Sequence, residues 1–132
     1  MDAAVVVMFL MVAAAASASR GTAVGGLRPA SVNEQGVQQA MAFAMEEYNK
    51  RSNDMFVNTI TKVNGVTKQI VAGTLYRIDA DIARTECKKS AVGVQNCPLH
   101  TDPDFVKSMN CKFEVFSVPW MRTISLEKHE CS

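Results

Sequence analysis

The sequence predicts an α+β domain in which one helix packs across an antiparallel sheet. Two observations carry this prediction. Between Val37 and Tyr48, apolar residues recur at intervals of three and four, which is the period of a helix with one buried face. Beyond that segment the period changes to two, which is typical of strands with one buried face. The chain has 132 residues, so we expect a single domain.

The helix is expected to begin near Val32 and to end near Lys50. Ser31 is a favourable N-cap residue, and Glu34 three residues later would complete a capping box. The predicted buried stripe consists of Val37, Ala40, Met41, Ala44, Met45 and Tyr48. The methionines are interpreted as residues that fill gaps in the core.

Several segments alternate between apolar and polar residues and are predicted to be strands. The clearest has Tyr76, Ile78, Ala80 and Ile82 on one face and Arg77, Asp79 and Asp81 on the other. Similar patterns place Cys111, Phe113 and Val115 in a second strand, and Ile124 and Leu126 in a third. The segment 56–63 is rich in β-branched residues and predicts a fourth strand. Asn64-Gly65 follows it, and this pair favours a tight hairpin turn.

The N-terminal segment has the features of a signal peptide. From Ala3 to Ala18 it carries no charge, and its apolar run is shorter than the roughly 20 residues that span a bilayer. Ala16-Ser17-Ala18 suits cleavage by signal peptidase. We therefore expect a signal peptide at residues 1–18, a mature domain at residues 19–132, and a secreted, extracellular protein. An uncleaved N-terminal anchor or a buried helix is the alternative.

Charge and cysteines limit the class of function. The chain has 14 basic and 13 acidic residues in no block of like charge, so we expect neither a nucleic-acid nor a membrane partner. Cys87, Cys97, Cys111 and Cys131 favour two disulfides in a secreted chain, and three pairings are open. The spacing of Cys97 and His100 leaves a zinc site as the alternative.

The sequence gives little support for an enzyme or a cofactor. Catalysis by a nucleophile needs a base within reach, and only His100 and His129 could serve as bases near neutral pH. Each lies near cysteines that are better explained as disulfide partners. Asp79 and Asp81 share one strand face and are interpreted as solvated side chains. We therefore expect no catalytic residue, no metal and no cofactor.

Three short motifs carry a resemblance to a known family. Gln69-Ile70-Val71-Ala72-Gly73 matches a Gln-x-Val-x-Gly loop, Gly25-Gly26 precedes it, and Pro119-Trp120 follows it. In this order, and with four cysteines in the C-terminal half, the chain resembles the secreted, disulfide-bonded (type 2) cystatins from about Val24 to Cys131. The segments 47–54 and 118–120 resemble the cystatin C subgroup most.

The resemblance implies a fold and a mechanism. The fold would be one long helix across about five antiparallel strands, with one strand running through Gly65 as a bulge and a hairpin turn at Gln69 to Gly73. Sequential pairing would join Cys87 to Cys97 and Cys111 to Cys131. The protein would be a reversible, tight-binding inhibitor of papain-like cysteine proteases such as cathepsins, since a rigid wedge of backbone can fill the cleft of such a protease.

The resemblance also implies the residues of the wedge. The first loop would consist of Gln69, Ile70, Val71, Ala72 and Gly73, the second of Pro119 and Trp120, and the N-terminal trunk of Ala23, Val24 and Gly25. Read without the resemblance, these segments are an ordinary turn, a tryptophan in the core beside a strand-ending proline, and a featureless tail. A protein that has this fold but binds without inhibiting is therefore the alternative function.

Two further expectations come from the same family. Asn53, in Ser52-Asn53-Asp54, matches an asparagine with which some type 2 cystatins inhibit legumain, a protease that cleaves after Asn. Read alone, Asn53 is an ordinary turn former. A monomer that forms domain-swapped dimers on heating is also expected, with Val71 as a source of strain in the hinge.

Overall fold

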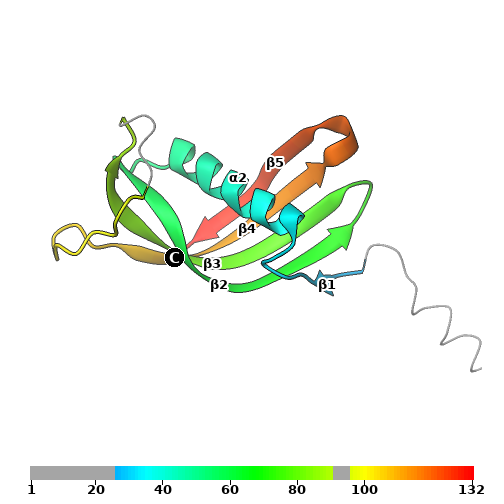
Figure 1. Ribbon diagram of the computed structural model, residues 1–132, viewed down its shortest axis with the longest axis horizontal. Helices are drawn as coiled ribbons and strands as arrows, with labels where there is room; N and C mark the ends of the chain where they lie inside the picture. Colours follow the sequence, from blue (N-terminus) through cyan, green and yellow to red (C-terminus); the bar gives the residue numbers. More distant parts are fainter. Residues whose placement is uncertain (1–25, 91–95) are drawn as a thin grey trace, which may run out of the picture.

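A five-stranded antiparallel sheet follows the order of the chain, and one helix crosses it (Figure 1). The computed structural model describes residues 26–90 and 96–132. The strands are β1 (Arg28–Pro29), β2 (Phe56–Ile70), β3 (Thr74–Lys88), β4 (Ser108–Val118) and β5 (Thr123–Cys131). Helix α2 (Gln35–Arg51) lies between β1 and β2, and the short 3-10 helix η1 (Pro119–Met121) joins β4 to β5. The predicted α+β architecture is confirmed.

The core lies between α2 and one face of the sheet. Val37, Ala40, Ala44 and Tyr48 of the helix are buried, and Met41 and Met45 pack against them. The sheet contributes chiefly Ile78, Ala80, Ile82, Phe113, Val115 and Leu126, which are all at most 6% exposed. Both predicted periodicities therefore identified the buried faces correctly, because each side chain's burial follows from the geometry of its own element.

The helix begins at Gln35, three residues later than predicted. Glu34, not Ser31, is the N-cap residue, and its ψ of 135° is extended. The Glu34 carboxylate does accept a hydrogen bond from the Ser31 N–H (2.8 Å), as in a capping box, but its other oxygen accepts one from Lys68 Nζ of β2 (2.6 Å). Since these two bonds lower the pKa of Glu34, the carboxylate remains charged and fixes a turn before the helix.

The sheet differs from the simplest reading of the sequence at Asn64-Gly65. This pair forms no hairpin turn; β2 continues through it to Ile70. The register against β3 shifts between Val63 and Gly65, so this position is a bulge, as the family pattern implied. The two-residue strand β1 had no signal of its own, because it depends on pairing Arg28 with Lys68 of β2.

Two disulfides close the C-terminal half of the sheet. Cys87 is bonded to Cys97, and Cys111 of β4 to Cys131 of β5, with Cα–Cα distances of 5.6 and 4.1 Å. The sequential pairing is confirmed, and with all four sulfurs in disulfides the zinc alternative is wrong. Among the described residues, no helix is long and apolar enough to cross a membrane.

Candidate functional site

The loop between β2 and β3 is a tight three-residue turn. It comprises Val71, Ala72 and Gly73, and the Val71 N–H donates a hydrogen bond to the Gly73 carbonyl (2.9 Å). Ala72 has a φ of 52° and Gly73 a φ of 143°. The strained backbone of this loop is thus at Ala72 and not at Val71, the residue predicted to be strained, because a left-handed conformation is unfavourable for a residue with a Cβ. Ile70 and Val71 are 46% and 40% exposed, so the loop presents apolar side chains to solvent.

Gly73 fits this position because it packs against β4. It is buried, and a Cβ at this position would lie 2.9 Å from Phe116 Cζ, from the Ser117 carbonyl oxygen and from Val118 Cγ2. Both its φ and this close approach exclude a side chain. The glycine therefore holds the first loop against the strand that leads directly into Pro119 and Trp120.

Substitution of Gly73 is expected to disturb both stability and the position of the loop. Gly73→Ala should destabilise the fold by about 2 kcal/mol, because a strained backbone and a collision with the Ser117 carbonyl must be relieved by moving the hairpin. Urea unfolding measures this effect. Gly65→Ala is the matched control, since no atom lies within 4 Å of a Cβ built there. Equal stability of the two variants would contradict the packing role of Gly73.

The second loop is η1, and its tryptophan lies on the surface. Trp120 is 71% exposed and Met121 64%, so the alternative of a core tryptophan is wrong. The loop closes with a hydrogen bond from the Arg122 N–H to the Pro119 carbonyl (3.0 Å), and Arg122 has a left-handed φ of 55°. Because Pro119 fixes its own φ, the indole is displayed on a stiff turn.

The N-terminal segment reaches the same end of the molecule. β1 pairs with β2, and the Ala30 N–H donates to the Val66 carbonyl (2.9 Å), so Leu27 lies beside the end of β2 with 57% of its surface exposed. Figure 1 shows the start of β1, the β2–β3 loop and the β4–β5 loop at one end of the sheet. The predicted trunk residues Ala23, Val24 and Gly25 lie outside the described residues.

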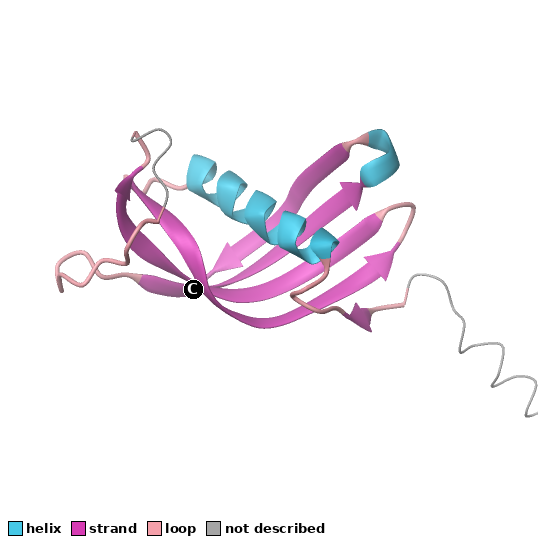
Figure 2. Cartoon of the chain, viewed as in Figure 1, coloured by secondary structure: helices cyan, strands magenta, loops and turns pink. Residues whose placement is uncertain are grey.

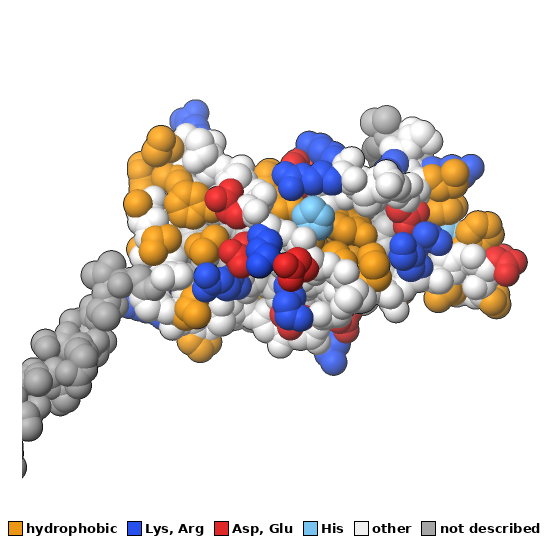
Figure 3. Space-filling model, turned by 180° about the vertical axis from the view of Figure 1, so that it is seen from behind, with side chains coloured by type: hydrophobic (Ala, Val, Ile, Leu, Met, Phe, Trp, Pro, Cys, Tyr) orange, Lys and Arg blue, Asp and Glu red, His pale blue; other side chains and the backbone are white. Residues whose placement is uncertain are grey.

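These segments create an exposed apolar edge. We call it the apolar edge and define it by Leu27, Ile70, Val71, Trp120 and Met121. In Figure 3, hydrophobic side chains gather at the left end of the molecule, whereas charged residues of both signs cover the middle. Leu27 and Met121 were not among the residues predicted for the wedge. Their only signal in the sequence was their adjacency to Gly25-Gly26 and Pro119-Trp120.

Asn53 lies at the opposite end of the structure. It is exposed in the short loop between α2 and β2, at the end of the sheet opposite the β2–β3 and β4–β5 loops (Figure 2). The flanking Ser52 and Asp54 are partly buried. Asn53 therefore does not belong to the apolar edge.

The candidate catalytic groups have structural partners instead. His100 stacks on Phe105 with a 5.4 Å centroid distance, and His129 lies edge-on to Tyr48.

Asp79 and Asp81 each accept hydrogen bonds from Asn110 and Asn64, which lower the pKa of both carboxyls. Since neither carboxyl is tuned to exchange a proton near neutral pH, this pair is unsuited to acid–base catalysis.

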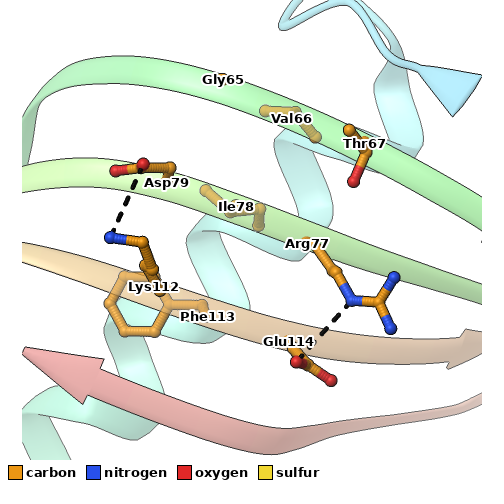
Figure 4. A pocket seen from close by; sticks show the side chains of 9 residues that line it. All are labelled: Gly65, Val66, Thr67, Arg77, Ile78, Asp79, Lys112, Phe113 and Glu114. Atoms are coloured by element: carbon orange, nitrogen blue, oxygen red, sulfur yellow. Dashed lines mark ion pairs between the residues drawn. The ribbon is translucent and has the colours of Figure 1, made fainter. Parts of the chain in front are cut away.

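A groove of about 380 Å³ lies over the bulge, on the sheet face away from the helix (Figure 4). Gly65 leaves it open on one side. Its charged rim is already paired, with Arg77 Nε 3.7 Å from Glu114 Oε2 and Lys112 Nζ 3.9 Å from Asp79 Oδ2. The groove offers no unpaired charge among these four residues and we assign it no ligand.

Comparison with known proteins agrees with this geometry. A family profile described as "Cystatin domain" matches residues 25–120. Cystatin-C of Bos taurus is 44% identical over 119 residues, which cover 90% of this chain and 80% of the relative. Cystatin-C of Homo sapiens is 41% identical over 131 residues, covering 97% and 90%. The chain belongs to the cystatin family.

Two solved structures share its fold. The crystal structure of dimeric human cystatin F matches with a TM-score of 0.75 and 28% identity, covering 84% of this chain and 89% of that one. Mouse fetuin-B, solved in complex with crayfish astacin, matches with a TM-score of 0.69 at 20% identity, which supports the fold alone. Cystatin family members are protease inhibitors, so this cystatin is an inhibitor of cysteine proteases and not an enzyme. Its similarity to Cystatin-C and its two disulfides place it with the type 2 cystatins.

Proposed function

We propose that this cystatin is a secreted, reversible, tight-binding inhibitor that inserts its apolar edge into the active-site cleft of papain-like proteases such as cathepsins. The observation that supports the proposal is the convergence of three segments, distant in sequence, at one end of the sheet, with Trp120 71% exposed among them. A lone exposed tryptophan on a stiff turn is the type of anchor that dominates the energetics of interfaces.

The roles within the wedge follow from the geometry of each segment. Val71 and Trp120 would supply apolar contact from two different hairpins, and Gly73 would keep the hairpins in register. Gln69, Ile70 and Ala72 would complete the first loop and Pro119 the second. Because the loops are held by the sheet before binding, little conformational entropy would be lost in the complex. The wedge would block the cleft without placing a peptide bond beside the catalytic cysteine.

Ala23, Val24 and Gly25 would extend the wedge as a trunk into the substrate-side pockets, since β1 begins three residues after Gly25. Secretion and removal of residues 1–18 form part of the same proposal, and the two disulfides suit an extracellular protein. A swapped dimer would open the β2–β3 loop, relieve the left-handed Ala72 and abolish inhibition of papain. Gel filtration after heating, with inhibition assayed on each fraction, tests the dimer.

A titration of active papain tests the main proposal. The mature chain should inhibit with a stoichiometry of one to one. A chain that starts at Gly26 should keep its thermal stability, because the described core does not include the trunk, but should dissociate faster. A mature chain that binds papain without inhibiting it, or fails to bind, would favour the alternative of a non-inhibiting cystatin-fold protein.

A second site at Asn53 is proposed for legumain. The exposed asparagine stands at the end of the molecule opposite the apolar edge, in a loop between a helix and a strand. A protease that cleaves after Asn needs an accessible Asn side chain and an adjacent peptide bond, and this loop offers both. Because the two sites are separate, one inhibitor molecule could bind both proteases at once.

A further inference from the structure

We propose that Arg84 and Lys89 are positioning residues that hold the Asn53 loop in a single conformation, so that it binds an Asn-specific protease without being turned over as a substrate. This inference rests on the proposed second site at Asn53. Neither residue adjoins Asn53 in sequence, since both belong to the end of β3 and the turn beyond it. They act through the two neighbours of Asn53.

Asp54, on the C-terminal side of Asn53, is fixed from three directions. Its Oδ1 accepts a hydrogen bond from the Phe56 N–H (3.0 Å), and its Oδ2 accepts bonds from Arg84 Nε (2.9 Å) and Asn58 Nδ2 (3.1 Å). The side chains of Arg84 and Asp54 are only 19% and 9% exposed, so water screens this ion pair little. Burial acts to raise the pKa of Asp54, but the hydrogen bonds prevail and lower it, so the carboxylate stays charged.

Arg84 is itself held in place. Its Nη1 donates to the Phe105 carbonyl (2.9 Å), and its guanidinium lies 5.9 Å from the centroid of the Phe56 ring. The guanidinium therefore links the Asn53 loop to the segment that precedes β4. A lysine could keep the charge at this position but could not form both hydrogen bonds with the same fixed geometry.

Ser52, on the N-terminal side, is fixed by Lys89. The ammonium of Lys89 donates to the Ser52 carbonyl (2.8 Å) and to Ser52 Oγ (2.9 Å). The Lys89 backbone N–H donates to the carbonyl of Met55 (2.9 Å). Lys89 thus holds both ends of the loop, two residues beyond Cys87, whose disulfide with Cys97 anchors this part of the chain.

The result is an exposed asparagine between two immobilised neighbours. Asn53 is exposed, whereas Ser52 and Asp54 are drawn toward the body of the protein. A loop that is already ordered loses little entropy when it binds, which favours affinity. The same tethers keep Asp54 in place if the Asn53–Asp54 bond is strained or attacked, which disfavours its release. An ion pair that served stability alone would affect neither the affinity for the protease nor the resistance of the loop to cleavage.

The test compares Arg84→Gln, Arg84→Lys and Lys89→Met with the wild type. Arg77→Gln is the matched control, because Arg77 is also a β3 arginine in an ion pair, at 3.7 Å from Glu114, but lies on the outer face of the sheet. For each protein, the inhibition constant for legumain is measured, and intact mass follows cleavage between Asn53 and Asp54. Papain inhibition reports whether each variant is folded, and hydrogen exchange of residues 53–55 reports the mobility of the loop.

Arg84→Gln and Lys89→Met should weaken legumain inhibition about tenfold or more, since hydrogen bonds to charged groups commonly contribute this much. Both variants should be cleaved after Asn53 faster than the wild type, exchange faster at residues 53–55, and inhibit papain normally. Arg84→Lys should fall between Arg84→Gln and the wild type, and Arg77→Gln should behave as the wild type.

Two outcomes distinguish failure of the positioning role of Arg84 and Lys89 from failure of the second site at Asn53. If the wild type inhibits legumain but Arg84→Gln and Lys89→Met match it in inhibition, cleavage and exchange, the positioning role is overturned. If the wild type is neither bound nor cleaved by legumain, the second site fails, and with it the inhibitory role of the tethers. Faster hydrogen exchange in the variants would then show that Arg84 and Lys89 order the loop for stability only.

Discussion

Trp120→Ala is expected to weaken inhibition of papain by about 2 kcal/mol or more, or roughly 30-fold, chiefly through faster dissociation. The indole is 71% exposed in the free protein, so its removal leaves no cavity in the core and should not reduce stability. In the proposed complex the same ring would be buried in the protease cleft. Stopped-flow association and displacement experiments give the two rate constants, and thermal unfolding checks the fold.

The control for this variant is Phe105→Ala. Phe105 is an aromatic residue that is 44% exposed, but it lies in the segment between Cys97 and β4, away from the apolar edge. Its truncation should leave papain inhibition unchanged even if stability falls slightly, because it stacks on His100. If Trp120→Ala inhibits as tightly as the wild type, the second loop does not bind the protease and the wedge is wrong.

Asn53→Lys is expected to abolish inhibition of legumain and to leave inhibition of papain unchanged. A lysine cannot form the amide hydrogen bonds by which a pocket selects asparagine, and it would bring an unpaired charge into that pocket. The substitution should be tolerated by the fold, since Asn53 is exposed. Inhibition constants for both proteases, measured on the same preparations, test the prediction.

A matched control is Asn33→Lys. Asn33 is an exposed asparagine in the turn before α2, at the other end of the helix, so this variant changes the net charge equally. It should inhibit both proteases as the wild type does. If Asn53→Lys lost both activities together, the two sites would not be independent. If it still inhibited legumain, the second site would lie elsewhere.

The local pattern of apolar residues was sufficient to predict the core. The stripe from Val37 to Tyr48 and the alternation from Tyr76 to Ile82 each specify which side of an element is apolar, and burial followed that specification. The local pattern was insufficient to predict the ends of helices and strands that depend on residues distant in sequence. The helix starts late because Lys68, 34 residues away in sequence, draws Glu34 into an extended conformation. Asn64-Gly65 favours a turn locally, yet pairing of β2 with β3 on both sides of it keeps the strand continuous.

The sequence by itself determined the two periodicities, the even set of four cysteines and the motifs that the family shares, since all of these are local properties of the chain. Only the tertiary structure decided that Trp120 faces solvent, that Gly73 must lack a side chain, and that Leu27 and Met121 join the same edge. It also decided that Arg84 and Lys89 hold the neighbours of Asn53. Each of these facts depends on contacts between strands or loops far apart in the chain, and such contacts leave no periodic signal in the sequence.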